Sequence, residues 1–260
     1  MKAIKYVSVV NRVLLLLHNG AILKFALMFT GDCDAQVIHE FIDHWIPLLS
    51  RNGTKKLILE ENNDRGEFKP HNFSSLDLTH LRLTRALFPH KLAFGGFRNL
   101  INLELVNATS NFGQSILDCP ALEKLTLIFC YGIFPINFHV PNLRSLHLVG
   151  QKESSNVVKV LGGLQKIEKF STGWNFLKYL AAGGCPSRLS QPLPYLKTLN
   201  IWEMNFVDLS EISCLLCLIW SAPNLSKLHI SASHLHFKSF CISTVSVSIK
   251  RIVSVPVKRN

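Results

Sequence analysis

The sequence is poor in charged residues and uses acidic ones in only part of its length. Charged side chains make up 17% of the 260 residues and hydrophobic ones 48%, so the chain can bury a large core and lacks a disordered composition. The first 31 residues and the last 24 carry nine basic residues and no acidic one. Removing these nine from the net charge of +11 leaves about +2 on the middle of the chain. Nucleic-acid binding needs a basic stripe on one face, so we expect no nucleic-acid partner.

A regular cysteine framework and a long uninterrupted apolar run are also missing. Seven cysteines, an odd number at irregular spacing, argue against a secreted disulfide scaffold and favour a reducing cytoplasmic or nuclear compartment. Cys214 and Cys217 form a single CxxC in an apolar context, which favours buried thiols over a zinc or redox site. The apolar run 7–17 is interrupted by Asn11 and Arg12 and is too short to cross a membrane, so we expect no membrane partner.

No motif of catalytic or cofactor chemistry is present either. The segment from His39 to His44 contains metal-ligand residue types, but its second histidine stands one residue too late for the H-E-x-x-H pattern. We interpret these residues as the solvated face of a helix. The glycine pairs fit neither a P-loop nor a dinucleotide fingerprint, and no nucleophile elbow occurs. The sequence therefore predicts no catalytic, cofactor or metal site, and not an enzyme.

A repeat is the main feature that the sequence does contain. The template L-x-x-L-x-L recurs nine times, and successive copies begin 21 to 32 residues apart. Six copies are clear and three are degenerate. The clear ones are Leu78-Leu81-Leu83, Leu100-Leu103-Leu105, Leu122-Leu125-Leu127, Leu143-Leu146-Leu148, Leu196-Leu199-Ile201 and Leu225-Leu228-Ile230. The degenerate ones are Ile22-Phe25-Leu27, Thr54-Leu57-Leu59 and Ile167-Phe170-Thr172.

This repeat predicts a fold class. Two apolar residues separated by one residue point to the same side of a strand, and each unit buries that side only against its neighbours. We therefore expect an α/β leucine-rich-repeat solenoid, or horseshoe, with a parallel β-sheet on the concave face and helices or irregular segments on the convex face. Prolines at 120, 141, 194 and 223 precede four copies, where they stop the convex segment and direct an extended chain into the strand.

Apolar residues at helical spacing predict two helices between the strands. The first starts near Asp34 as a plausible N-cap and stops at Gly53, with Pro47 expected to kink it or end it early. The second runs roughly from Glu211 to Trp220. We divide the chain into an N-terminal helix or cap remnant (1–21), a leucine-rich-repeat domain (22–232) and an atypical, poorly ordered basic tail (233–260).

Residues between the leucines form the candidate binding surface. If the leucines point into the core, these residues point outward on the concave face. Trp202 is the best single anchor, since aromatic and arginine side chains dominate interface energies, although it could instead pack under a neighbouring loop. The candidate protein-binding residues are Lys56, Glu60, His80, Arg82, Asn102, Glu104, Lys124, Thr126, His147, Lys169, Thr198, Asn200, Trp202, Lys227 and His229.

Several segments outside the leucine template resemble plant F-box/FBD/leucine-rich-repeat proteins, and they occur in the same order. The matching segments are 10–20, 42–53, 97–100, 119–125, 176–184 and 213–219, and the resemblance covers roughly residues 8–232. Members of this family carry an F-box that binds the Skp adaptor of a cullin ubiquitin ligase, while the repeats present a substrate. The resemblance therefore implies a substrate-recognition module with an unidentified protein substrate.

The two ends of the chain depart from the family pattern. No F-box-like stretch precedes the repeats, and no FBD segment is recognisable after them. We expect Skp and cullin partners only if a cryptic F-box exists. One alternative is a free-standing repeat protein or truncated paralogue that competes for partners without ligase activity, and another is a non-functional gene fragment.

Overall fold

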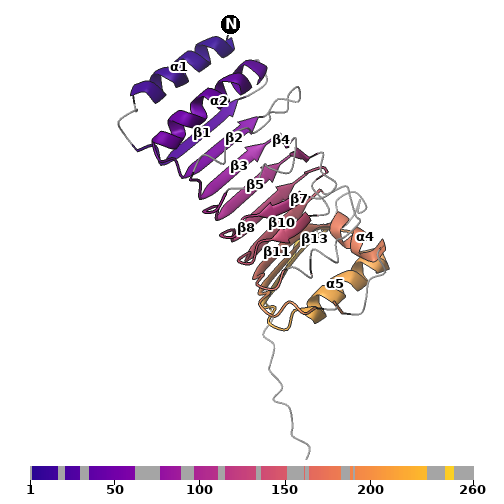
Figure 1. Cartoon of the computed structure of the whole chain (residues 1–260). Helices are drawn as coiled ribbons and strands as arrows, with labels where there is room; N and C mark the ends of the chain where they lie inside the picture. The colour runs from indigo at the N-terminus through magenta and orange to yellow at the C-terminus, as the bar shows by residue number, and fades with distance from the viewer. Residues whose placement is uncertain are drawn as a thin grey trace, which may run out of the picture.

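The computed structural model describes residues 2–16, 21–29, 35–61, 77–88, 97–110, 115–132, 136–150, 161, 164–182, 188–189, 191–232 and 244–248. Its main feature is one ten-stranded, mostly parallel sheet in a mixed α/β fold, compatible with a leucine-rich-repeat fold (Figure 1). The strands stack in chain order. They are β1 (Lys24–Phe29), β2 (Lys56–Glu61), β3 (His80–Thr84), β5 (Asn102–Val106), β8 (Lys124–Ile128), β10 (Ser145–Val149), β11 (Lys169–Gly173), β12 (Thr198–Met204), β13 (Lys227–Ala232) and β14 (Thr244–Ser248).

Each of the nine template copies leads into one strand from β1 to β13, as predicted. Burial alternates along these strands: Leu103 and Leu105 are 1% exposed, whereas Glu104 between them is half-buried. The neighbouring strands from β1 to β13 pair in parallel, with template leucine opposite template leucine. Only the end copies are looser, at Phe25 and Ile230, which are partly buried. The core is therefore a continuous layer of leucines on one side of the sheet.

A β-turn precedes most strands. In four repeats its second residue is the proline noted in the sequence. The amide of Leu122 donates to the carbonyl of Cys119 at 3.0 Å across Pro120, and the later repeats repeat this bond. Proline suits this position because its fixed φ matches the turn. The prolines thus act by closing a turn at the sheet edge.

A second corner lies where the strands leave the sheet. Phe129, two residues past the last leucine of its repeat, has a φ of 50°, and its amide donates to the carbonyl of Val149 in the next repeat at 2.8 Å. Positive φ is uncommon for residues other than glycine. It recurs at the same template position, at Arg85, Asn107, Phe129, Gly150 and Glu203.

Two helices lie at the N-terminal end of the stack: α1 (Lys2–Leu16) and α2 (Ala35–Arg51). The α2 side chain Trp45 is 1% exposed, stacks edge-on against Phe25 of β1 and donates to Asn11 of α1 at 2.6 Å. The predicted α2 is thereby confirmed, and its expected N-cap lies outside the described residues. The described part of the chain has no helix long and apolar enough to span a bilayer.

Pro47 does not end α2 early, so of the two expected outcomes, a kink or an early end, the early end is wrong. Helix α2 continues to Arg51, because Pro47 lies on the exposed side, where water can satisfy the carbonyl group that loses its donor. The predicted stop at Gly53 is confirmed: its φ is 68°, and its amide donates to the carbonyl of Ser50 at 3.0 Å.

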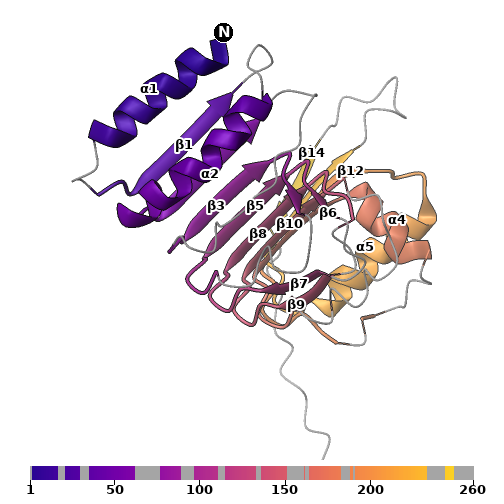
Figure 2. The same ribbon diagram turned by 45° about the horizontal axis from the view of Figure 1, so that its top comes forward.

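Helices α4 (Trp174–Ala182) and α5 (Leu209–Ser221) pack against each other at the other end of the stack (Figure 2). Helix α5 was predicted. It starts two residues earlier than expected because the side chain of Asp208 caps it by accepting from the amide of Ser210. Cys214 and Cys217 on α5 are buried and are not joined in a disulfide. Helix α4 was not predicted as a helix.

Five further strands among the described residues were not predicted. Two short parallel pairs, β4 (Leu87–Phe88) with β6 (Thr109–Ser110) and β7 (Ser115–Asp118) with β9 (Ile136–His139), lie outside the main sheet. Strand β14 lies within the segment expected to be a basic tail, and it pairs antiparallel with β13. Its sequence alternates valine with hydroxyl residues, which suits an edge strand.

Candidate functional site: the open face of the sheet

The candidate site is the face of the sheet opposite the leucine core. We call it the open face, because the described helices pack on the leucine side, through contacts such as Phe25 with Trp45 and Phe170 with Phe176. The strand register arranges its side chains in three rows. All fifteen sequence-predicted binding residues lie on these strands, at positions between or beside the template leucines.

The first row stands at the start of the strands, and we call it the lysine row. Its members face one another across the register: Lys24, Lys56, His80, Asn102, Lys124, Ser145, Lys169, Thr198 and Lys227. It contains no acidic residue. The central row, two residues further on, consists of Ala26, Ile58, Arg82, Glu104, Thr126, His147, Ser171, Asn200 and His229.

The third row stands one residue past the last template position of each strand. It is mainly apolar and consists of Met28, Glu60, Thr84, Val106, Ile128, Val149, Gly173, Trp202 and Ser231. The open face is therefore graded, with cations at the starts of the strands and apolar side chains at their ends.

The lysine row creates a positive potential. Lys56, Lys124, Lys169 and Lys227 are exposed, and within the described parts of the chain none of them forms an ion pair. Burial lowers the pKa of His80, and Lys56 and Lys124 lower it further. Burial is the larger cause of this lowered pKa, and the nearby cations add to it because they disfavour the charged imidazole.

His147 in the central row behaves in the same way. Burial lowers its pKa, Lys169 adds to this effect, and Glu104 opposes it. Burial is therefore the main cause of the lowered pKa, and among the two charged neighbours Lys169 has a larger effect than Glu104. An anion bound across this part of the face would raise the pKa of His147.

Arg82 organises the N-terminal half of the open face. Its Nη1 donates to Oε1 of Glu104 at 2.8 Å, and its Nε lies 2.7 Å from Oε1 of Glu60 in an ion pair. The three side chains come from three adjacent strands, so they tie β2, β3 and β5 together. Sequence analysis named all three without pairing them. Arg82 and Glu104 occupy the same template position in consecutive repeats, which is the signal that could have paired them.

Two central-row residues serve the fold more than the surface. Asn200 donates through Nδ2 to Oγ of Ser171 at 2.7 Å, and the two residues are only 8% and 3% exposed. Sequence analysis placed Asn200 among the binding residues because it follows a template leucine. Its burial leaves it little surface for a partner to contact.

Trp202 is 40% exposed at the end of β12. Three exposed apolar residues follow it before and at the start of α5: Phe206, Val207 and Leu209. Sequence analysis did not single out these three, although apolar residues next to a capping Asp208 were the available signal. Trp202 is therefore followed in the chain by several exposed apolar side chains, which lie between the end of β12 and the start of α5.

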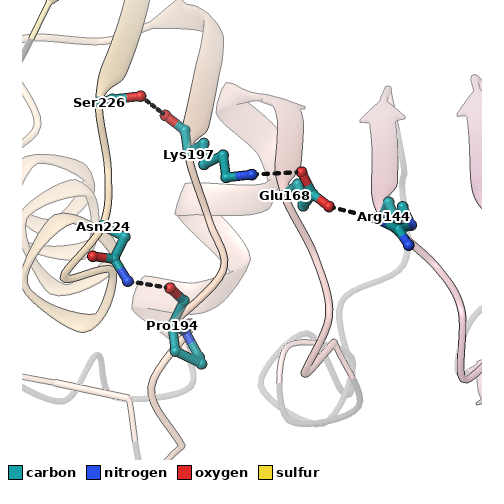
Figure 3. Close-up of polar contacts among 6 residues, drawn as sticks. All are labelled: Arg144, Glu168, Pro194, Lys197, Asn224 and Ser226. Atoms are coloured by element: carbon teal, nitrogen blue, oxygen red, sulfur yellow. Dashed lines mark hydrogen bonds and ion pairs between the residues drawn. The ribbon is translucent and has the colours of Figure 1, made fainter.

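A separate set of polar contacts lies at the turns that lead into the strands (Figure 3). Glu168 accepts from Arg144 at 2.8 Å and from Lys197 at 3.0 Å, and the hydrogen bonds from Lys197 and then Arg144 hold the pKa of Glu168 below its usual range. The side chain of Asn224 donates to the carbonyl of Pro194 at 2.7 Å. These contacts join consecutive repeats, and sequence analysis did not find them.

The described residues contain no group of three or more His, Cys, Asp or Glu side chains placed to hold a metal ion. Within the motif that starts at His39, Nδ1 of His44 lies 2.8 Å from the carbonyl oxygen of Glu40 on an exposed helix side. The side chain of His39 lies outside the described residues.

Comparison with known proteins gives one significant relative. No family model and no solved structure matches the chain. An F-box/FBD/LRR-repeat protein of Arabidopsis thaliana is 32% identical over 254 residues, which is 84% of this chain and 59% of the relative. The chain thus spans about three fifths of the length of this relative.

Proposed function

We propose that this chain, which belongs to the F-box/FBD/LRR-repeat family, forms a leucine-rich-repeat solenoid whose open face binds another protein. The observation that carries the proposal is the continuous register of nine parallel strands, from β1 to β13, which presents three rows of side chains on one face. At about 4.8 Å between strands, this face spans roughly 40 Å. That width is on the scale of a standard protein interface.

The proposed role is binding without catalysis, in the cytoplasm or nucleus, and with neither nucleic acid nor membrane as partner. In support, the acidic side chains Glu60 and Glu104 on the open face are held by Arg82. A general acid or base has to be within reach of a substrate proton. Carboxylates engaged by an arginine are instead suited to fixing the surface that a partner meets.

The family name further suggests a place in a ubiquitin ligase. We propose that the chain supplies the substrate-recognition part of an F-box/LRR protein of the SCF type, with Skp and cullin as further partners wherever an F-box is attached. The alternative is a repeat protein that competes for the same substrates without delivering them to ubiquitination. Support for both rests on the similarity to the Arabidopsis thaliana relative.

A pull-down with a plant Skp adaptor separates these two roles. A full-length F-box relative is the positive control, and circular dichroism verifies that the chain is folded. Retention of the chain by Skp supports the ligase role. Failure of a folded chain to bind, while the relative does bind, shows that these 260 residues do not bind Skp by themselves, and capture of a substrate of the relative by the same chain then supports the competitor role.

Alanine variants test the open face itself. Partners captured by the wild-type chain are expected to be lost or weakened with Trp202→Ala and with Arg82→Ala. Trp220→Ala is the matched control, because Trp220 is also exposed, at 52%, but lies on α5. Partner binding that survives both open-face variants, or that Trp220→Ala reduces equally, contradicts the proposed site.

A further inference from the structure

The lysine row differs from the basic residues right beside it. Lys55, Arg144 and Lys197 stand one position earlier in their repeats, and each is held by a carboxylate, Asp77 or Glu168. Those basic residues join repeats. The exposed lysines Lys56, Lys124, Lys169 and Lys227 form no ion pair within the part of the chain that the structure describes. Their charge is therefore available to a ligand.

The spacing of these lysines is regular in the C-terminal half of the sheet. Lys124, Lys169 and Lys227 lie on β8, β11 and β13, each two strands from the next, with Ser145 and Thr198 between them. Because neighbouring strands lie about 4.8 Å apart, these ammonium groups repeat about every 10 Å. An α-helix rises about 10.5 Å over seven residues, and residues seven apart lie on nearly the same face of the helix.

The third row supplies the apolar half of the same surface. Val106, Ile128 and Val149 face one another on three adjacent strands, half-buried, and exposed Trp202 extends the row at β12. Four residues along a strand separate this row from the lysine row, or about 13 Å. A helix with its side chains is about 10–12 Å across, so one helix laid across the strands reaches both rows.

We propose that the open face binds an acidic amphipathic helix of the partner protein, laid across the strands, with carboxylates at heptad spacing over Lys124, Lys169 and Lys227 and apolar side chains over the third row. This inference rests on the proposed function, because it names the occupant of the open face. Opposite charges across the interface would set the register of the helix and speed its association. The apolar contacts would supply most of the buried area.

Nucleic acid is the main competing ligand for a row of lysines. Phosphates attract lysine as strongly as carboxylates do, but a phosphate backbone gives the apolar third row nothing to bury. The near-neutral net charge of the middle of the chain also argues against nucleic acid as the ligand. The helix accounts for both rows, so the test includes an oligonucleotide as competitor.

The probe is a fluorescent synthetic peptide of three heptads with glutamate at every seventh position and leucines on the adjoining stripe. A second peptide has the same composition but scatters the glutamates around the helix. Dissociation constants are measured by anisotropy with the full 260-residue chain, at about 50 and 200 mM salt. The binding variant is Lys124→Gln/Lys169→Gln/Lys227→Gln. The control, Lys5→Gln/Arg98→Gln/Arg188→Gln, removes the same charge from exposed residues outside the main sheet.

We expect the patterned peptide to bind more tightly than the scattered one, with an affinity that falls as salt rises. In the binding variant, the dissociation constant of the patterned peptide should rise at least about ten-fold and depend less on salt. In the control variant, this dissociation constant should stay within about two-fold of the wild-type value. In NMR titrations, the pKa of His147 should rise when the patterned peptide binds. That rise reports a carboxylate near Lys169 when the amide chemical shifts of the rest of the chain stay unchanged, because unfolding would also raise this pKa by exposing the imidazole.

Three results would overturn the proposal: equal binding of the two peptides, equal loss in the control variant, or displacement of the peptide by an oligonucleotide that binds more tightly. Failure of the patterned peptide to bind at all would also overturn it. If the helix proposal fails in this way but Trp202→Ala still abolishes capture of a cellular partner, then the proposed acidic helix is wrong and the open face remains the binding site. If the open-face variants leave that capture unchanged as well, the proposed function fails with it.

Discussion

A Cβ atom on Gly150 would overlap Cδ1 of the Phe129 ring. The two residues occupy the same template position in consecutive repeats, and both have a positive φ. Each amide at this corner lies beside the next repeat, so the ring of Phe129 lies against the backbone of its neighbour. Gly150 is thus favoured by its positive φ, which other residue types also adopt at this template position, and required by the space that Phe129 occupies.

Gly150→Ala is expected to lower the free energy of unfolding by about 2 kcal/mol, because the left-handed conformation alone disfavours a side chain by about 1 kcal/mol and the contact with Phe129 adds to it. Urea denaturation measures the change. Gly53→Ala is the matched control: Gly53 also has a positive φ, 68°, but open space at its Cβ position. Equal losses in the two variants would show that the Phe129 contact has no energetic effect.

Thr172→Val should stabilise the protein by about 1 kcal/mol, because it removes a buried hydroxyl group that has no hydrogen-bond partner. Thr172 is 0% exposed and stands where the template has a leucine. Thermal denaturation measures the change. Thr126→Val, a half-buried open-face position, is the control and is expected to change stability by less than about 0.5 kcal/mol. A lower melting temperature for Thr172→Val would contradict this prediction.

Glu61 makes stability depend on pH. Burial raises the pKa of Glu61 from 4.5 to about 7, although Arg85 limits the rise. Between these values the folded state keeps a proton that the unfolded state loses, so stability is full below about pH 4.5 and decreases as the pH rises through about 7.

Glu61→Gln removes this titration. The variant should be more stable than the wild type at pH 8, by on the order of 1–3 kcal/mol, and equally stable near pH 4. Denaturation curves across this pH range measure the difference, with the exposed Glu123→Gln as control. A constant difference between variant and wild type at all pH values would show that Glu61 does not titrate in this range.

The turn asparagines are expected to stabilise the contact between repeats. Asn142 and Asn224 each donate to a proline carbonyl of the preceding repeat, at 2.9 and 2.7 Å. Replacing either with alanine should lower the free energy of unfolding by about 0.5–1 kcal/mol. Ala121 occupies the same turn position in another repeat. Ala121→Asn should therefore add a side-chain hydrogen bond between repeats and slightly raise the free energy of unfolding. A loss of stability in Ala121→Asn would contradict the assigned role.

The strands were predictable because the leucine template fixes both their position and the side that they bury. Leu103 and Leu105 illustrate this: two leucines at period 2, repeated at a similar interval, lie on one side of a strand. Helix α2 was predictable from its apolar stripe for the same kind of reason. At these positions, the local pattern and the tertiary packing both require an apolar side chain that points into the core.

The side-chain pairings, the burial of Asn200 and strand β14 could not be predicted, because they depend on which strands become neighbours. The pairing of Arg82 with Glu60 and Glu104 needs the register of three strands. Asn200 looked exposed because alternation predicts an outward side chain, yet its bond to Ser171 on the next strand accompanies nearly complete burial. Strand β14 forms by pairing with the edge of β13, because a five-residue strand is not stable without a partner strand.

The antiparallel direction of β14 limits how copies of this protein can polymerise. A second copy that stacked its parallel strands end to end on this edge would meet a strand that runs the opposite way. The repeat geometry therefore cannot continue in phase from one molecule into the next through β14. The edge is also short, and exposed Ser246 and Ser248 flank exposed Val247; short edge strands are one way in which proteins resist aggregation. A sheet built from additive repeats thus ends with a strand that discourages fibre growth at this end.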